Sequence, residues 1–79
     1  MSNVSVIKED GYYLKIIMDR DVINNLPKHI LHETPLAEYM VLGNEEEISI
    51  IENILGERIS GNYCFDWFLI YEKGKNNEF

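Results

Sequence analysis

Two histidines and one cysteine are the side chains of this sequence best suited to binding a metal ion. His29 and His32 are three residues apart with Glu33 beside them, and on a helix this spacing places both imidazoles on one face. A tetrahedral zinc site needs four ligands, so Cys64 or a remote carboxylate would have to contribute. We expect a surface histidine pair, and the sequence predicts neither a bound metal ion nor a cofactor.

The other reactive groups have simpler structural explanations. Cys64 and a histidine could form a nucleophile and its base, but a cysteine in an aromatic stretch is more often a small buried hydrophobe. Residues Glu45 to Glu47 stand where acids favour the start of a helix. The sequence contains no glycine-rich phosphate loop and no Gly-x-Ser-x-Gly motif. It therefore predicts a protein without enzymatic activity.

Asp66 is unusual because it lies between Phe65 and Trp67, in the most apolar stretch of the chain. A carboxylate in such a place either faces solvent or pairs with a base such as Arg58, since unpaired charges are rarely buried. We expect an exposed strand carboxylate.

The stretch that would position these groups is Tyr63 to Tyr71, which gathers most of the large apolar side chains. In an extended strand, alternate residues face opposite sides of a sheet. One side would carry Tyr63, Phe65, Trp67, Leu69 and Tyr71. The other side would carry Cys64, Asp66, Phe68, Ile70 and Glu72. Because both sides hold apolar residues, this segment is predicted to be a central strand.

A hairpin is predicted at the N-terminus. Two strand-like runs, residues 4–9 and 12–18, flank Asp10-Gly11, a pair favoured by type I′ turns. That turn places Ile7 opposite Leu14. One hairpin face is then mostly apolar and the other is mixed, which is typical of an antiparallel sheet with one face on the core.

Helices are predicted at two further places. Asp19 to Leu26 reads as a short helix that Pro27 ends, and Lys28 to Glu33 adds another turn. The strongest helix signal is Asn44 to Leu55, with Asn44 as N-cap and acids in the first turn. Gly56 would be its C-cap.

Thr34-Pro35 resembles the start of a helix, which would extend over Leu36 to Met40, whereas the residue types of 39–42 favour a strand. Of these two alternatives we favour a strand at 38–42 that the Gly43-Asn44 turn ends. Residues 73–79 read as a frayed tail. The fold expected for residues 1–79 is therefore a single α+β domain, with a small antiparallel sheet covered on one face by one or two helices.

The distribution of charge is more informative than its sum. The 79 residues carry a net charge of −7, and acids and bases balance in residues 1–32 and again in 67–79. The excess lies in residues 33–66, where Arg58 is the one base. The acids of this segment are Glu33, Glu38, Glu45, Glu46, Glu47, Glu52, Glu57 and Asp66. Clustered charge of this kind attracts basic partners and repels nucleic acid.

Location can also be predicted from the sequence. A single cysteine excludes the internal disulfides on which small secreted domains depend, and the N-terminus has no signal-peptide pattern. We therefore expect a cytoplasmic protein that is not associated with membranes.

These features favour a small acidic inhibitor that binds the basic, nucleic-acid-binding surface of a larger protein. By analogy, nuclease immunity proteins, DNA mimics and anti-CRISPR proteins have such features. The predicted partner-binding residues are Glu45, Glu46, Glu47, Glu52 and Glu57, with Tyr39 and Tyr63 as aromatic anchors. Two alternatives remain open: a structural or regulatory protein that self-associates, for example as a homodimer, and a small metal- or ligand-binding domain.

Overall fold

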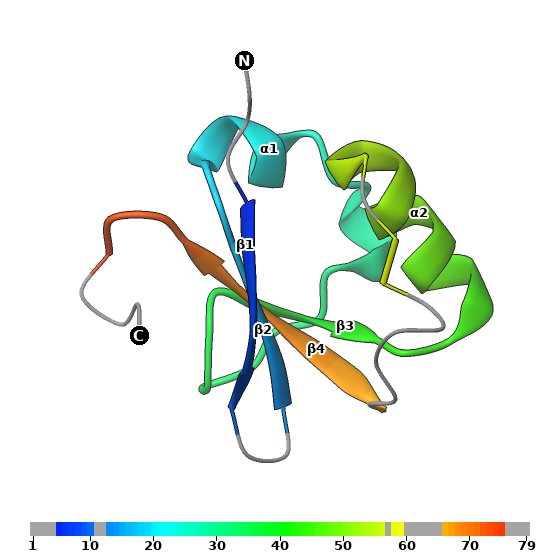
Figure 1. Cartoon of the computed structure of the whole chain (residues 1–79), viewed down its shortest axis with the longest axis horizontal. Helices are drawn as coiled ribbons and strands as arrows, with labels where there is room; N and C mark the ends of the chain where they lie inside the picture. The colour runs from blue at the N-terminus through cyan, green and yellow to red at the C-terminus, as the bar shows by residue number, and fades with distance from the viewer. Residues whose placement is uncertain (1–4, 11–12, 57, 60–65, 76–79) are drawn as a thin grey trace.

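The computed structural model of the chain describes residues 5–10, 13–56, 58–59 and 66–75 (Figure 1). Its strands are β1 (Ser5–Asp10), β2 (Tyr13–Met18), β3 (Tyr39–Leu42) and β4 (Trp67–Glu72). Its helices are α1 (Arg20–Asn24), the short 3-10 helix η1 (Lys28–Ile30) and α2 (Glu45–Leu55). The α+β class predicted from the sequence is confirmed.

The strands form a four-stranded sheet in the order β1-β2-β4-β3. β4 lies between β2 and β3, so the prediction of a central strand is confirmed for Trp67 to Tyr71. Residues 63–65 of the predicted strand lie outside the described residues. The prediction of a wholly antiparallel sheet is wrong, because β4 pairs in parallel with β2 and antiparallel with β3. The chain between β2 and β4 contains both α-helices, and a crossover of that length lets a strand return in the same direction.

The hairpin of β1 and β2 has a different register from the predicted one. Ile7 pairs with Ile16, and Asp10 pairs with Tyr13, whereas the Asp10-Gly11 turn would have paired Ile7 with Leu14. The slip is two residues. Because side chains alternate with a period of two, such a slip leaves Leu14, Ile16 and Met18 on the face predicted for them.

The main core lies between one face of the sheet and the helices (Figure 1). From the sheet it takes Leu14, Ile16, Met18, Val41, Phe68 and Ile70. From the helices and the segments after them it takes Val22, Ile23, Leu26, Ile30, Ile48, Ile51 and Ile59. The hairpin face predicted to be mostly apolar is therefore buried at Leu14, Ile16 and Met18, and α2 buries Ile48 and Ile51 against it.

A smaller apolar cluster lies on the opposite face of the sheet. It consists of Ile17, Leu69 and Tyr71, with Tyr13, Ala37 and Met40 packed against it. The Tyr71 hydroxyl donates to the Leu36 carbonyl at 2.9 Å, so the loop before β3 is attached to this face.

The helix ends follow the local chemistry of the sequence. In α2, the Asn44 side chain accepts from the Glu47 N–H at 2.8 Å, and Gly56 ends the helix with φ +73°, as predicted. Asp19 precedes α1 but makes no side-chain cap bond. Among the described residues, no helix has the length and apolar content needed to cross a bilayer.

Candidate protein-interaction surface

The end of the sheet where β3 finishes and β4 begins brings together residues from three elements. Leu42, the last residue of β3, pairs with Trp67, the first residue of β4. The next residue, Gly43, donates its N–H to the Asp66 carbonyl at 2.7 Å. α2 starts immediately afterwards at Glu45 (Figure 1). This turn therefore holds the start of the acidic helix against the start of the central strand.

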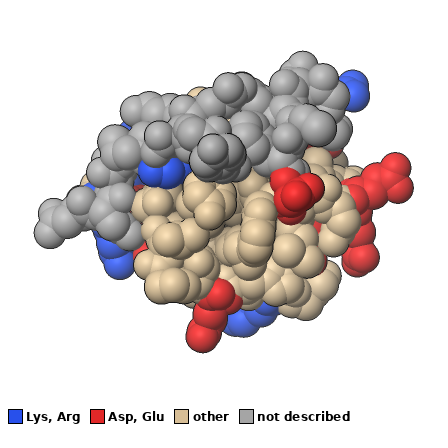
Figure 2. Space-filling model, turned by 90° about the horizontal axis from the view of Figure 1, so that it is seen from below, with Lys and Arg blue, Asp and Glu red and all other residues tan. Residues whose placement is uncertain are grey.

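Glu45, Glu46 and Asp66 are all exposed at this end, and we call these three residues the acidic end. The expectation of an exposed Asp66 is thereby confirmed. Figure 2 shows acidic side chains toward the right of the molecule, the side on which α2 begins in Figure 1, and a further acidic group at the lower left. Trp67, beside them, is 43% exposed.

Glu47 has a different environment from its two neighbours. It is buried, and its Oε1 accepts from the Leu42 N–H at 2.9 Å. His32 Nε2 lies 3.3 Å from each of its carboxylate oxygens. Glu47 therefore joins the start of α2 to the end of β3, and its carboxylate is occupied within the protein.

Glu52 also has an internal partner, because its Oε2 accepts from the N–H of the buried Ile59 at 2.7 Å. Tyr39 is half-buried and packs against the main core. Glu57 and Tyr63 lie outside the described residues. Among the seven predicted partner-binding residues, Glu45 and Glu46 are thus the ones described as exposed to solvent.

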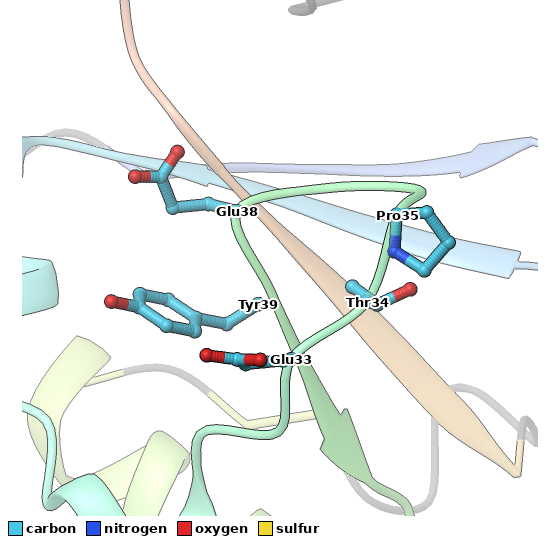
Figure 3. Close-up of a pocket in the computed structure, with 5 residues that line it drawn as sticks. All are labelled: Glu33, Thr34, Pro35, Glu38 and Tyr39. Atoms are coloured by element: carbon cyan, nitrogen blue, oxygen red, sulfur yellow. The ribbon is translucent and has the colours of Figure 1, made fainter.

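Tyr39 also lines a shallow, open pocket at the start of β3 with Glu33, Thr34, Pro35 and Glu38. Figure 3 shows the side chains of Tyr39 and Glu33 extending to the same side, with Pro35 away from them. The Glu38 carboxylate is already paired with bases from other elements. We assign no ligand to this pocket.

The two histidines do not share a helix face. His29 lies in η1, but the chain is already extended at Leu31, and His32 forms a bridge with Met40. The predicted helical turn over Lys28 to Glu33 is therefore shorter than expected. No group of three metal-ligating side chains occurs in the part of the chain that the structure describes, and Cys64 lies outside it.

An ion-pair cluster at the far end of β4 was not predicted from the sequence. Arg20 Nη2 lies 2.6 Å from Glu38 Oε2, and Arg20 Nε donates to Glu72 Oε1 at 3.1 Å. Lys75 Nζ lies 3.5 Å from Glu72 and 3.7 Å from Glu38. Hydrogen bonds from Arg20 hold the pKa of Glu72 below its ordinary value, and the two carboxylates raise the pKa of Arg20.

This cluster changes the distribution of exposed charge. It neutralises Glu38, one of the acids of the 33–66 segment, with bases from outside that segment. Arg20 and Lys75 balance Glu38 and Glu72 in this cluster. The exposed Lys73 follows the last residue of β4, whereas the acidic end adjoins its first residue. The two ends of the central strand therefore present opposite charges to solvent.

No protein-family model matches this chain, and no curated protein or solved structure matches it with significant similarity.

Proposed function

We propose that this protein is a small non-enzymatic inhibitor whose acidic end binds the basic, nucleic-acid-binding surface of a larger protein. The observation that carries the proposal is the position of Glu45, Glu46 and Asp66. These three exposed carboxylates lie at one end of a small sheet. The carboxylates of Glu38, Glu47 and Glu52, by contrast, form ion pairs or accept hydrogen bonds within the protein, and none of these contacts involves the acidic end.

The electrostatics favour a basic partner over nucleic acid. Clustered carboxylates raise the rate of encounter with a positively charged surface and repel phosphates. The exposed Lys73 at the opposite end of β4 makes the two ends of that strand differ in charge, which would orient the molecule during the encounter. Opposed charges across a protein interface supply specificity and association rate more than affinity, so binding should depend strongly on salt.

Charge reversal tests this proposal. The double variant Glu45→Lys/Glu46→Lys changes the formal charge from −7 to −3, because each substitution replaces a negative charge by a positive one. The matched control is Asp21→Lys/Glu33→Lys, which changes the charge equally at exposed sites outside the acidic end. Tagged proteins are used to capture partners from host lysate at low and high salt, with identification by mass spectrometry.

We expect wild type and the control to retain one basic, nucleic-acid-binding protein at low salt. The acidic-end variant should lose at least tenfold in affinity for it, about 1.4 kcal/mol. Equal capture by both double variants would exclude the acidic end as the binding surface.

Self-association is a second candidate, favoured by the two different edges of the sheet. At the β3 edge, Met40 exchanges backbone hydrogen bonds with His32 at 2.8 and 2.9 Å, and Glu47 accepts from Leu42. β1 forms the other edge of the described sheet, with β2 as its one neighbour among the described strands. Such an edge can pair with a strand of a second molecule. Light scattering over a concentration series would reveal a dimer.

A further inference from the structure

The β3 edge of the sheet is closed to a further strand. Met40 and His32 bond each other through their backbones, and the Leu42 N–H donates to Glu47. His32 Nε2 also lies 3.3 Å from both carboxylate oxygens of Glu47, which fastens the segment before β3 to α2. The outward backbone groups of Met40 and the outward N–H of Leu42 are therefore already bonded within the protein.

The β1 edge is different. In the described part of the chain, β1 pairs with β2 alone, over all six residues from Ser5 to Asp10. In an antiparallel pair, about half of the backbone N–H and C=O groups of a strand point away from its neighbour. Such a row of groups favours pairing with another strand. The described sheet can therefore be extended at β1.

Ile7 shows what kind of strand would fit there. It pairs with the fully buried Ile16 and packs against the main core, but it is itself only half-buried. The apolar layer of the core thus reaches solvent at its β1 rim, and a strand docked there should place an apolar residue beside Ile7. A second copy of β1 does so by symmetry, because a two-fold axis can place the same residue on both sides of the interface.

We propose that two copies of this chain pair antiparallel through β1, with Ile7 directly opposite the partner's Ile7. In this register Lys8 is opposite the partner's Val6, and Glu9 is opposite the partner's Ser5. Centring the pair on Lys8 or on Glu9 would oppose like charges, which is destabilising. A slip of one residue would exchange the faces of the added sheet, so the proposed register keeps the helices of both copies on the same face.

The inference rests on self-association, the second candidate function, and assigns its strand, register and symmetry. It does not depend on the acidic end as a binding surface. In the strand order β1-β2-β4-β3 the acidic end adjoins β4 and β3, whereas β1 is the opposite edge. The dimer therefore keeps the two acidic ends apart and leaves both of them accessible to other proteins.

Disulfide cross-linking tests the register. The single native cysteine is removed by Cys64→Ser, and Ile7→Cys and Lys8→Cys are compared in that background under mild oxidation, with circular dichroism to verify folding. Directly opposed residues have Cα atoms about 4.5–5.5 Å apart, within the roughly 4.4–6.8 Å that a disulfide spans. The two copies of residue 8 would be diagonal neighbours at about 7–8 Å, which is too far for a disulfide.

Light scattering on wild type over a concentration series should approach twice the mass of one chain. Ile7→Cys should cross-link at least about tenfold faster than Lys8→Cys. A dimer that cross-links equally at both positions, or faster at residue 8, would overturn the proposed register and leave self-association standing. A wild-type chain that is monomeric at every concentration would overturn the β1 dimer and the self-association candidate together, while the acidic end is tested separately by the capture experiment.

Discussion

Replacing Glu47 by alanine should destabilise this protein more than any other single change in the acidic first turn of α2. The substitution removes the acceptor of the Leu42 N–H, bonded at 2.9 Å, and the carboxylate 3.3 Å from His32 Nε2. A hydrogen bond to a charged group contributes about 1.5–3 kcal/mol, and an orphaned donor costs a similar amount. We expect a loss of about 2–3 kcal/mol.

That loss is large for a domain of this size, whose core leaves roughly 3–5 kcal/mol of net stability. Each 1 kcal/mol corresponds to about 4–8 °C in Tm for a small domain, so Tm should fall by at least about 8 °C. Urea unfolding followed by circular dichroism and by tryptophan fluorescence measures the change in the free energy of unfolding.

The matched control is Glu46→Ala, on the preceding residue of the same helical turn. Its side chain is exposed, so its loss should be limited to the helix-dipole contribution of about 0.3–1 kcal/mol. Equal losses for the two variants would refute the assignment of Glu47 as the link between β3 and α2. Glu47→Gln retains an acceptor oxygen and should lie between them.

Two further predictions concern the ion-pair cluster and the end of α2. The pKa of Glu72 is lowered from its ordinary 4.5, so its contribution to stability is complete above pH 4.5 and is lost as the pH falls through the lower folded-state value. Glu72→Gln should therefore reduce the slope of unfolding free energy against pH below 4.5, and an unchanged slope would contradict the pairing. Gly56 has φ +73°, and apart from its chain neighbours no atom of the described residues lies within 4 Å of the position that a Cβ would occupy there. Gly56→Ala should therefore cost about 1–2 kcal/mol of unfolding free energy from backbone strain alone. A neutral result in urea unfolding would contradict the left-handed cap.

The parts of the fold that depend on neighbouring residues were predictable from the sequence. Asn44 and Gly56 bound α2 because capping chemistry acts within a few residues, and alternation identified the two faces of β4. The hairpin register was wrong because the preference of Asp10-Gly11 for a turn is weak compared with the pairing of whole strands. The parallel pairing of β2 with β4 depends on the long crossover, which local patterns do not encode.

The predicted site was only partly correct, because some of its acids contact residues that are far away in the sequence. Arg20 reaches Glu38 and Glu72 across 18 and 52 residues, and counting charge by segment cannot detect such pairs. The burial of Glu47 was predictable from the sequence, because Glu47 precedes the buried Ile51 by four residues and residues at that spacing share a helix face. The exposure of Trp67 was not predictable from the sequence, because strand alternation assigns Trp67 to the same side as the buried Leu69 and Tyr71.

Displacement of nucleic acid is the most direct test of the central claim. The captured partner is bound to a fluorescent duplex, and this protein is added while polarisation is recorded. We predict that wild type releases the duplex, that Asp21→Lys/Glu33→Lys does so equally, and that Glu45→Lys/Glu46→Lys requires at least about tenfold more protein, in proportion to its lost affinity. A partner that holds the duplex and this protein at the same time would contradict the claim, because the acidic end would then bind elsewhere.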